Sequence, residues 1–292
     1  MRGWWQDLTD LVLPTECGGC GTPRTVLCRE CSAALSGAAP CRVRPVPEPP
    51  GLPAVHAAAS YADEVRATLL AHKERGALAL AGPLGSALAG AVRAGLRDAR
   101  GVSAGTCGVQ VVTSWGDGVP AGSGDVPVLL VPVPSARWAL RARGHDPVRR
   151  IALAAAGALR RSGTPARVAA VLRQRRAVAD QSGLDSRQRL NNLAGALEVT
   201  VRGARLLHGG GVVLVDDLMT TGASLAEAAR AVRVAIAYDR GTRAVYPCAT
   251  REGREERTTG SRKERANGTY RVALICAAVV AAPPDSFEMN RN

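Results

Sequence analysis

The sequence lacks any apolar run long enough to cross a membrane. The longest unbroken run, residues 272–282, has eleven residues, whereas a membrane helix needs about 20. The first fourteen residues contain Asp7 and Asp10 and no small-residue cleavage site, so they do not resemble a signal peptide. We therefore expect a cytoplasmic protein without a membrane span.

Aromatic residues are also scarce, with four Trp, four Tyr and one Phe among 292 residues. A groove for single-stranded nucleic acid normally combines positive charge with stacked aromatic rings, and this chain offers few such rings. Positive charge is plentiful, because the net charge is +13. Residues 135–190 contain 13 Arg, three Asp and no Lys. Arg in place of Lys favours forked recognition of phosphate, although a GC-rich genome would also write Arg for Lys.

Four of the eight cysteines form two C-x-x-C pairs, Cys17 with Cys20 and Cys28 with Cys31. In a reducing compartment such pairs favour metal over disulfides, and four thiolates are the ligand set of a structural zinc site. The spacing therefore predicts a structural zinc module. Redox chemistry and four unligated buried thiols are the alternatives.

The composition divides the chain into three parts. We expect a zinc-binding module over residues 1–45, a proline-rich linker over 46–55 and a larger domain over 56–292. Two segments of the large domain, 100–125 and 237–271, show no period and are predicted to be insertions. The second is interpreted as a disordered surface excursion or as the trace of a disturbed reading frame.

From residue 126 onward, short apolar runs alternate with helical patterns. Strands are expected at 126–133, 168–172 and 211–215, and helices at 145–161 and 187–193. This alternation predicts an α/β fold with a mostly parallel sheet flanked by helices. Ligands of such sheets bind at the carboxyl ends of the strands.

The most informative segment is GVVLVDDLMTTGAS, residues 211–224, in which an apolar strand ends in two carboxylates and continues into a loop of small residues. Asp216 and Asp217 are candidate catalytic residues that can accept hydrogen bonds from ribose hydroxyls, and one of them can reach Mg²⁺ through water. The following loop offers backbone N–H groups, hydroxyls and a helix N-terminus to a phosphate. Its candidate ligand-binding residues are Thr220, Thr221, Gly222, Ala223 and Ser224. An ordinary strand–turn–helix with capping residues is the alternative.

This segment resembles the ribose-phosphate motif of the type I phosphoribosyltransferases. Further blocks resemble the ComF (competence protein F) family, in the same order over most of residues 10–230. These blocks are Leu13-Pro14 with the cysteine pairs, Tyr61 followed by His72-Lys73, VPVP at 131–134, RGHD at 143–146, and residues 181–192. The resemblance implies a type I phosphoribosyltransferase fold that binds phosphoribosyl pyrophosphate, or a related ribose phosphate, together with magnesium.

The resemblance also implies roles for two further loops. The loop after strand 126–133 is expected to receive pyrophosphate through Pro134, Ser135, Arg137 and Arg143, with Arg141 as another candidate cation. Residues 173–192, here named the hood segment, resemble the mobile hood that closes over ligand in this fold. Its candidate ligand-binding residue is Gln181, and Arg173, Arg176, Arg187 and Asn191 are further residues of this segment.

The chain departs from the family pattern at His145-Asp146, where the family commonly has an aromatic residue followed by an amide. We interpret His145 as a residue at a helix N-terminus that fills the aromatic position, and a role in acid–base catalysis is the alternative. His56, His72 and His208 belong to no recognisable constellation and are interpreted as structural or surface residues.

Two functions from different classes follow. The first is an enzyme that displaces pyrophosphate from a phosphoribosyl ligand in competence-linked DNA uptake or processing. The second is a non-catalytic factor that senses such a ligand and holds single-stranded DNA on its Arg-rich face, where Trp138 is the one well-placed aromatic residue; the competence helicase machinery is a candidate protein partner. A third interpretation, in which the zinc module reads DNA, is disfavoured by Glu16 and Glu30 beside the cysteines.

Overall fold

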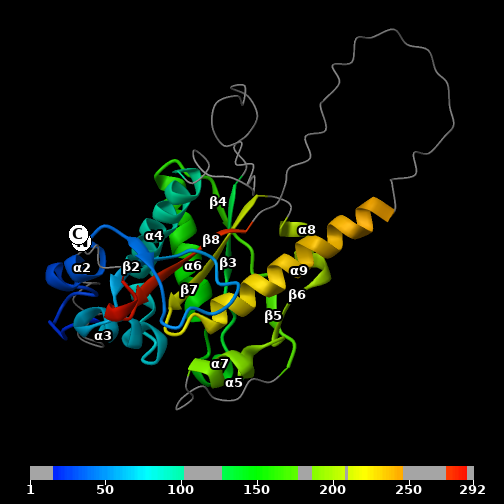
Figure 1. The fold of residues 1–292 in the computed structure, drawn as a ribbon. Helices are drawn as coiled ribbons and strands as arrows, with labels where there is room; N and C mark the ends of the chain where they lie inside the picture. The colour runs from blue at the N-terminus through cyan, green and yellow to red at the C-terminus, as the bar shows by residue number, and fades with distance from the viewer. Residues whose placement is uncertain (1–15, 102–126, 177–185, 208–209, 246–273, 288–292) are drawn as a thin grey trace, which may run out of the picture.

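The computed structural model describes residues 16–101, 127–176, 186–207, 210–245 and 274–287. These residues form a central sheet with helices on both of its faces (Figure 1). The predicted α/β class, with a mostly parallel sheet flanked by helices, is confirmed.

The six-stranded sheet has the order β1-β2-β8-β7-β3-β4. Only β1 runs antiparallel to its neighbour, and the other four pairings are parallel. The strands are β1 (Cys41–Val43), β2 (Val55–Ser60), β3 (Val128–Pro132), β4 (Ala166–Val168), β7 (Gly211–Leu218) and β8 (Leu274–Ala282). A separate antiparallel pair consists of β5 (Leu172–Gln174) and β6 (Leu197–Val199). β7, which is apolar from Val212 to Val215, thus lies inside the sheet, where parallel strands require neighbours and cover on both faces.

Helices cover both faces of the sheet. One face carries α2 (Arg29–Ser36), α3 (Asp63–Lys73), α4 (Ala81–Gly101) and α6 (Pro147–Arg161), with the short 3₁₀ turn η1 (Leu78–Leu80) before α4. The other face carries α8 (Val201–Leu207) and α9 (Ala223–Val245). The remaining elements are α5 (Arg137–Arg143), α7 (Ser186–Leu193) and the C-terminal turn η3 (Pro284–Ser286).

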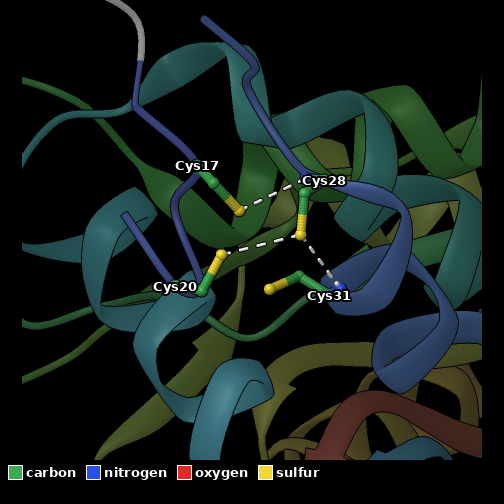
Figure 2. Close-up of side chains that lie close together, drawn as sticks. All are labelled: Cys17, Cys20, Cys28 and Cys31. Carbon is green, nitrogen blue, oxygen red and sulfur yellow. Dashed lines mark hydrogen bonds between the residues drawn. The ribbon is translucent and has the colours of Figure 1, made fainter. Parts of the chain in front are cut away.

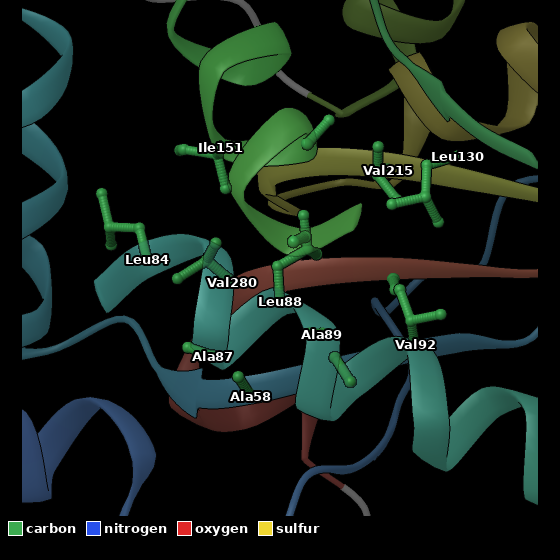
Figure 3. Packing of buried hydrophobic residues seen from close by; sticks show 14 of the residues in the cluster. Ala58, Leu84, Ala87, Leu88, Ala89, Val92, Leu130, Ile151, Val215 and Val280 are labelled. Carbon is green, nitrogen blue, oxygen red and sulfur yellow. The ribbon is translucent and has the colours of Figure 1, made fainter. Parts of the chain in front are cut away.

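The core follows the alternation of side chains along each strand. Val213 and Val215 of β7 join the cluster beneath α4 and α6, whereas Val212 and Leu214 join the cluster beneath α9. Figure 3 shows the first cluster, in which Leu88 of α4 and Ile151 of α6 meet the sheet. Burying an aliphatic side chain of this size contributes about 1.5–3 kcal/mol. Apolar packing on both faces therefore holds the end of β7 in a defined position.

The predicted boundaries of the parts stay predictions. β1, which belongs to the segment 1–45, pairs with β2 through Cys41↔Ala57 to Val43↔Val55, and the linker 46–55 joins these two strands. Arg233 of α9 donates a hydrogen bond to the Gly51 carbonyl at 2.7 Å. Most of the predicted insertion 100–125 lies outside the described residues; α9 continues to Val245, and the rest of the insertion 237–271 lies outside them too.

One helical stretch among the described residues, Leu78–Arg100, is long and apolar enough to span a membrane by length and composition. The apolar window of this stretch is 56% buried against the rest of the protein. A core helix passes the same test, so this feature is weak evidence in either direction.

Candidate metal and ligand sites

The two C-x-x-C pairs meet in one cluster (Figure 2). The thiol sulfurs of Cys17, Cys20, Cys28 and Cys31 all lie within 4.8 Å of one another, and the sulfurs of Cys20 and Cys28 are 3.6 Å apart. Four thiolates arranged as a tetrahedron about 2.3 Å from zinc lie about 3.8 Å from one another. The four cysteines can therefore hold a metal such as zinc.

Backbone N–H groups point at the sulfurs of the cluster. The N–H of Cys28 donates to Cys17 Sγ at 3.2 Å, and the N–H of Cys31 donates to Cys28 Sγ at 3.4 Å. Burial alone would raise the pKa of Cys17, but hydrogen bonds from the backbone of Cys20, Cys28 and Gly19 outweigh it and lower that pKa to about 6. Burial raises the pKa of the Cys31 thiol, where the neighbouring sulfurs add to the effect. Four thiolates at this separation require a cation, as a metal site does.

The cluster packs against α3 and the 3₁₀ turn η1 through residues without side chains. A Cβ on Gly18 would lie 2.5 Å from Leu80 Cδ1, and a Cβ on Gly19 would lie 2.5 Å from Cys31 Sγ and 3.2 Å from Thr68 Oγ1. A larger residue at either position would require the neighbouring side chain to shift. The cysteine cluster is thus in direct contact with α3, the helix that ends at the second site.

The second site begins where β7 ends. Asp216 is half-buried and the Asp217 side chain is 6% exposed. The N–H of Asp217 donates to Asp216 Oδ1 at 2.9 Å. These two residues, here called the acidic pair, stand at the carboxyl end of the strand, where open α/β sheets bind ligands.

Lys73, the last residue of α3, forms an ion pair with the acidic pair. Its Nζ lies 2.9 Å from Asp217 Oδ2, and its side chain is 31% exposed. The carboxylate of Asp217 raises the pKa of Lys73, against a smaller opposite effect of burial. Lys73 is therefore charged, and it supplies a cation to Asp217 at this site.

Among the residues that the structure describes, none forms an ion pair of this kind with Asp216. Burial raises its pKa well above the usual range for aspartate, and the neighbouring carboxylate of Asp217 raises it further, whereas Lys73 acts in the opposite direction. A cation or a hydroxyl donor from a ligand would stabilise the charged form of a carboxyl in this position. The acidic pair can therefore bind a ligand that carries such groups.

The loop after β7 forms a small hollow together with Asp216. Residues 218–225 line it, including Thr220, Thr221, Gly222, Ala223 and Ser224. Helix α9 begins at Ala223, so its free N–H groups belong to the same loop. Gly222 has φ of +73°, and a Cβ there would lie 3.1 Å from Leu52. The positive φ and the close side chain explain why glycine is required at this turn.

The predicted pyrophosphate loop lies beside the acidic pair. The N–H of Val133 donates to the Val215 carbonyl at 2.9 Å, so Pro134 and Ser135 leave the sheet next to the end of β7. Both residues are half-buried. Arg137, whose side chain is outside the description, starts α5.

Arg143, at the end of α5, is engaged by Glu74. Its Nε donates to Glu74 Oε2 at 3.0 Å and its second guanidinium nitrogen donates to Glu74 Oε1 at 2.6 Å. The Arg143 side chain is 16% exposed and that of Glu74 is 47% exposed. The guanidinium group of Arg143 binds the Glu74 carboxylate through two parallel hydrogen bonds, and arginine binds phosphate groups in the same way.

His145 packs between α3 and the turn that joins α5 to α6. Its Nδ1 lies 3.0 Å from the Arg143 carbonyl and its Nε2 lies 3.3 Å from the His72 carbonyl. The rings of His72 and His145 meet edge to face with centroids 6.0 Å apart. Burial lowers the pKa of His72. These contacts join the end of α3 to the turn after Arg143. They agree with the interpretation of both histidines as residues that support the fold.

A cleft of about 400 Å³ lies on the other side of Arg143. Trp138, which is 55% exposed, lines it together with Glu74, Arg75, Arg143 and His145. An exposed indole in a cleft that two arginines also line can stack on a flat ring.

Only part of the hood segment is described. Arg173 pairs with Glu198 at 2.8 Å, and Arg176 donates to the Asn192 carbonyl at 2.8 Å. Gln181 lies outside the described residues, and nothing is described for the side chains of Arg187 and Asn191. β6 is tied to α9, because Glu227 accepts the N–H of Leu197 at 2.9 Å.

Sequence reasoning did not assign Lys73 and Glu74 to the site. The only sequence signal was the block His72-Lys73, quoted for its resemblance and given no role. The residues of the Lys73 ion pair are 144 positions apart, so no local pattern relates them.

Comparisons with known proteins add no assignment. A scan against protein-family models finds no match to this chain. A search of curated proteins finds no significant match either.

Proposed function

We propose that this chain is a ComF-like protein of the type I phosphoribosyltransferase fold that binds phosphoribosyl pyrophosphate, or a related ribose phosphate, at the end of β7. The observation that carries the proposal is the hollow formed by Asp216 and the loop 218–225, at the carboxyl end of a buried parallel strand. The order of the motifs along residues 10–230, quoted above, supports the same assignment.

Each part of the hollow suits one part of this ligand. The acidic pair can accept hydrogen bonds from the two ribose hydroxyls, and Asp216, whose pKa burial raises, gains most from such donors. The N–H groups of the loop and the N-terminus of α9 can hold the 5′-phosphate. Arg143 and Ser135 lie on the side where pyrophosphate is expected.

The acidic pair could hold a magnesium ion that binds together with pyrophosphate. When bound, this ion would neutralise negative charge on the departing pyrophosphate. The chain's own contribution to a transfer reaction is to orient the ribose through Asp216 and Asp217. It also stabilises the departing pyrophosphate through Arg143. Pyrophosphate displacement by a nucleophile is the proposed reaction, in the cytoplasm and in competence-linked DNA handling.

Calorimetric titration of phosphoribosyl pyrophosphate with Mg²⁺ tests this function. The wild type is expected to bind, and Asp216→Ala/Asp217→Ala is expected to lose binding while it keeps its circular dichroism spectrum. Asp285→Ala removes an exposed carboxylate outside the hollow and is expected to bind as the wild type does. A folded wild type that does not bind refutes the proposal.

A second function, a non-catalytic factor that holds single-stranded DNA, is favoured by the exposed Trp138 beside Arg75 and Arg143. Its affinity for an oligonucleotide should fall steeply with salt and fall further in Trp138→Ala. It should be unchanged in Asp216→Ala/Asp217→Ala. Loss of turnover with unchanged DNA affinity in that double variant would show that the two functions use separate surfaces. The competence helicase machinery is the protein partner proposed with this function.

The four cysteines are proposed to hold structural zinc. Structural zinc contributes directly to folding free energy, and this module contacts α3 rather than the hollow.

A further inference from the structure

Two adjacent residues at the end of α3, Lys73 and Glu74, pair with side chains of opposite charge at the site. Lys73 lies 2.9 Å from the Asp217 carboxylate. Glu74 accepts two hydrogen bonds from Arg143, at 2.6 and 3.0 Å. A single dipeptide therefore presents a cation to the acidic pair and an anion to the Arg143 turn.

Glu74 is not placed there by helix stability. It is the C-cap residue of α3, where the helix dipole favours cations and disfavours a carboxylate. Lys73, in the last turn, follows that preference. The forked pairing with Arg143 is what holds Glu74 at this end of the helix.

We propose that Lys73 and Glu74 occupy, in the ligand-free protein, the places of the cation and the anion of a metal–pyrophosphate ligand, so that the site selects a ligand carrying both charges. This inference rests on the proposed function, because it concerns the same site. Glu74 and Lys73 are positioning residues here: they hold Arg143 and Asp217 in their binding geometry until the ligand replaces them.

The selectivity follows from charge. A metal-free pyrophosphate that reaches Arg143 meets the carboxylate of Glu74, which repels it. A metal ion alone that reaches Asp217 meets the ammonium of Lys73. A complex of the two displaces both residues at once and gives Asp217 and Arg143 each an opposite charge as partner.

The surroundings permit the exchange. The Glu74 side chain is 47% exposed and borders the cleft of about 400 Å³, so it can swing away from Arg143 without repacking the core. Lys73 is 31% exposed and is likewise able to turn toward solvent. Asp217 and Arg143, at 6% and 16% exposed, are the partners that stay in place.

The test is calorimetric titration of inorganic pyrophosphate, with and without Mg²⁺, into wild type and Glu74→Gln. Glutamine keeps the shape of the side chain and removes the competing charge, so metal-free pyrophosphate should bind about tenfold tighter than to wild type. Glu64→Gln is the matched control, because it removes the same charge from the exposed first turn of the same helix. A second arm titrates Mg²⁺ alone into Lys73→Gln, which should bind it about tenfold tighter than wild type does.

Tightening in Glu74→Gln but not in Glu64→Gln supports the inference. Unchanged or weaker pyrophosphate binding in Glu74→Gln overturns it, as does equal tightening in both variants. Unchanged Mg²⁺ binding in Lys73→Gln overturns the part assigned to Lys73. The proposed function is read separately, from phosphoribosyl pyrophosphate: if wild type binds it and Glu74→Gln shows no change with pyrophosphate, only this inference falls. If wild type fails to bind it while Glu74→Gln tightens pyrophosphate binding, only the proposed function falls.

Discussion

The ion pair between Lys73 and Asp217 joins α3 to the end of β7, and its strength can be measured with a double-mutant cycle. Removing one partner from a fully buried pair costs about 3–5 kcal/mol, whereas exposed pairs contribute about 0–1 kcal/mol. Asp217 is 6% exposed and Lys73 is 31% exposed, so this pair lies between these limits. We expect a coupling energy of about 2 kcal/mol between Lys73→Met and Asp217→Asn.

The assay is urea unfolding of zinc-loaded wild type, both single variants and the double variant at pH 7. Arg173 and Glu198 provide a control pair at a similar distance, 2.8 Å, with side chains that are 59% and 35% exposed. The cycle Arg173→Met/Glu198→Gln should give at most about 0.5 kcal/mol. A Lys73–Asp217 coupling no larger than that of the control pair would refute the assignment of Lys73 to the site.

Three further predictions concern the metal, the acidic pair and the loop. Cys28→Ser should reduce the zinc content measured by atomic emission and lower the midpoint of thermal unfolding by about 5–10 °C; Cys41→Ser, outside the cluster, should change neither, and equal zinc loss in both would contradict the assigned ligands. Because burial raises the pKa of Asp216, its charged form disfavours folding, so Asp216→Asn should unfold at a higher temperature than wild type once the pH rises above that pKa. The difference should vanish in acid, and a less stable variant at pH 8 would contradict the unfavourable effect of burial on the Asp216 carboxylate. Gly222→Ala and Gly163→Ala place alanine at φ of +73° and +83°, so both should lose about 1–2 kcal/mol in urea unfolding. Only Gly222→Ala should weaken binding of phosphoribosyl pyrophosphate, and equal binding in the two variants would remove the loop from the site.

Local patterns in the sequence predicted the features that depend on neighbouring residues. The cysteine pairs lie within fifteen positions of one another, from Cys17 to Cys31, and the structure brings the four sulfurs together. The apolar run before Asp216 predicted a buried strand, and β7 is one. The expected helix at 145–161 corresponds to α6, which starts at Pro147 after the capping residue Asp146.

Features that depend on distant contacts were not predictable. β2 reads VHAAAS, and its alanines favour a helix over a strand. It is a strand because β1 and β8 pair with it on either side. The role of Lys73 depends in the same way on how α3 packs beside the end of β7. The predicted ligands, magnesium and DNA stay predictions.

The place of β8 in the sheet has a consequence for synthesis of the protein. β8 is the last strand of the described residues, yet it lies between β2 and β7. When β7 has emerged from the ribosome, β2 still lacks its parallel neighbour, and the apolar edges of both strands stay open until residue 282 has been made. At about 5–20 residues per second, the 64 residues between the ends of β7 and β8 leave this nascent chain exposed for about 3–13 seconds. A chaperone that covers sheet edges during this interval would raise the yield of folded protein, whereas a stop codon before β8 would release a chain with nothing to fill the centre of its sheet.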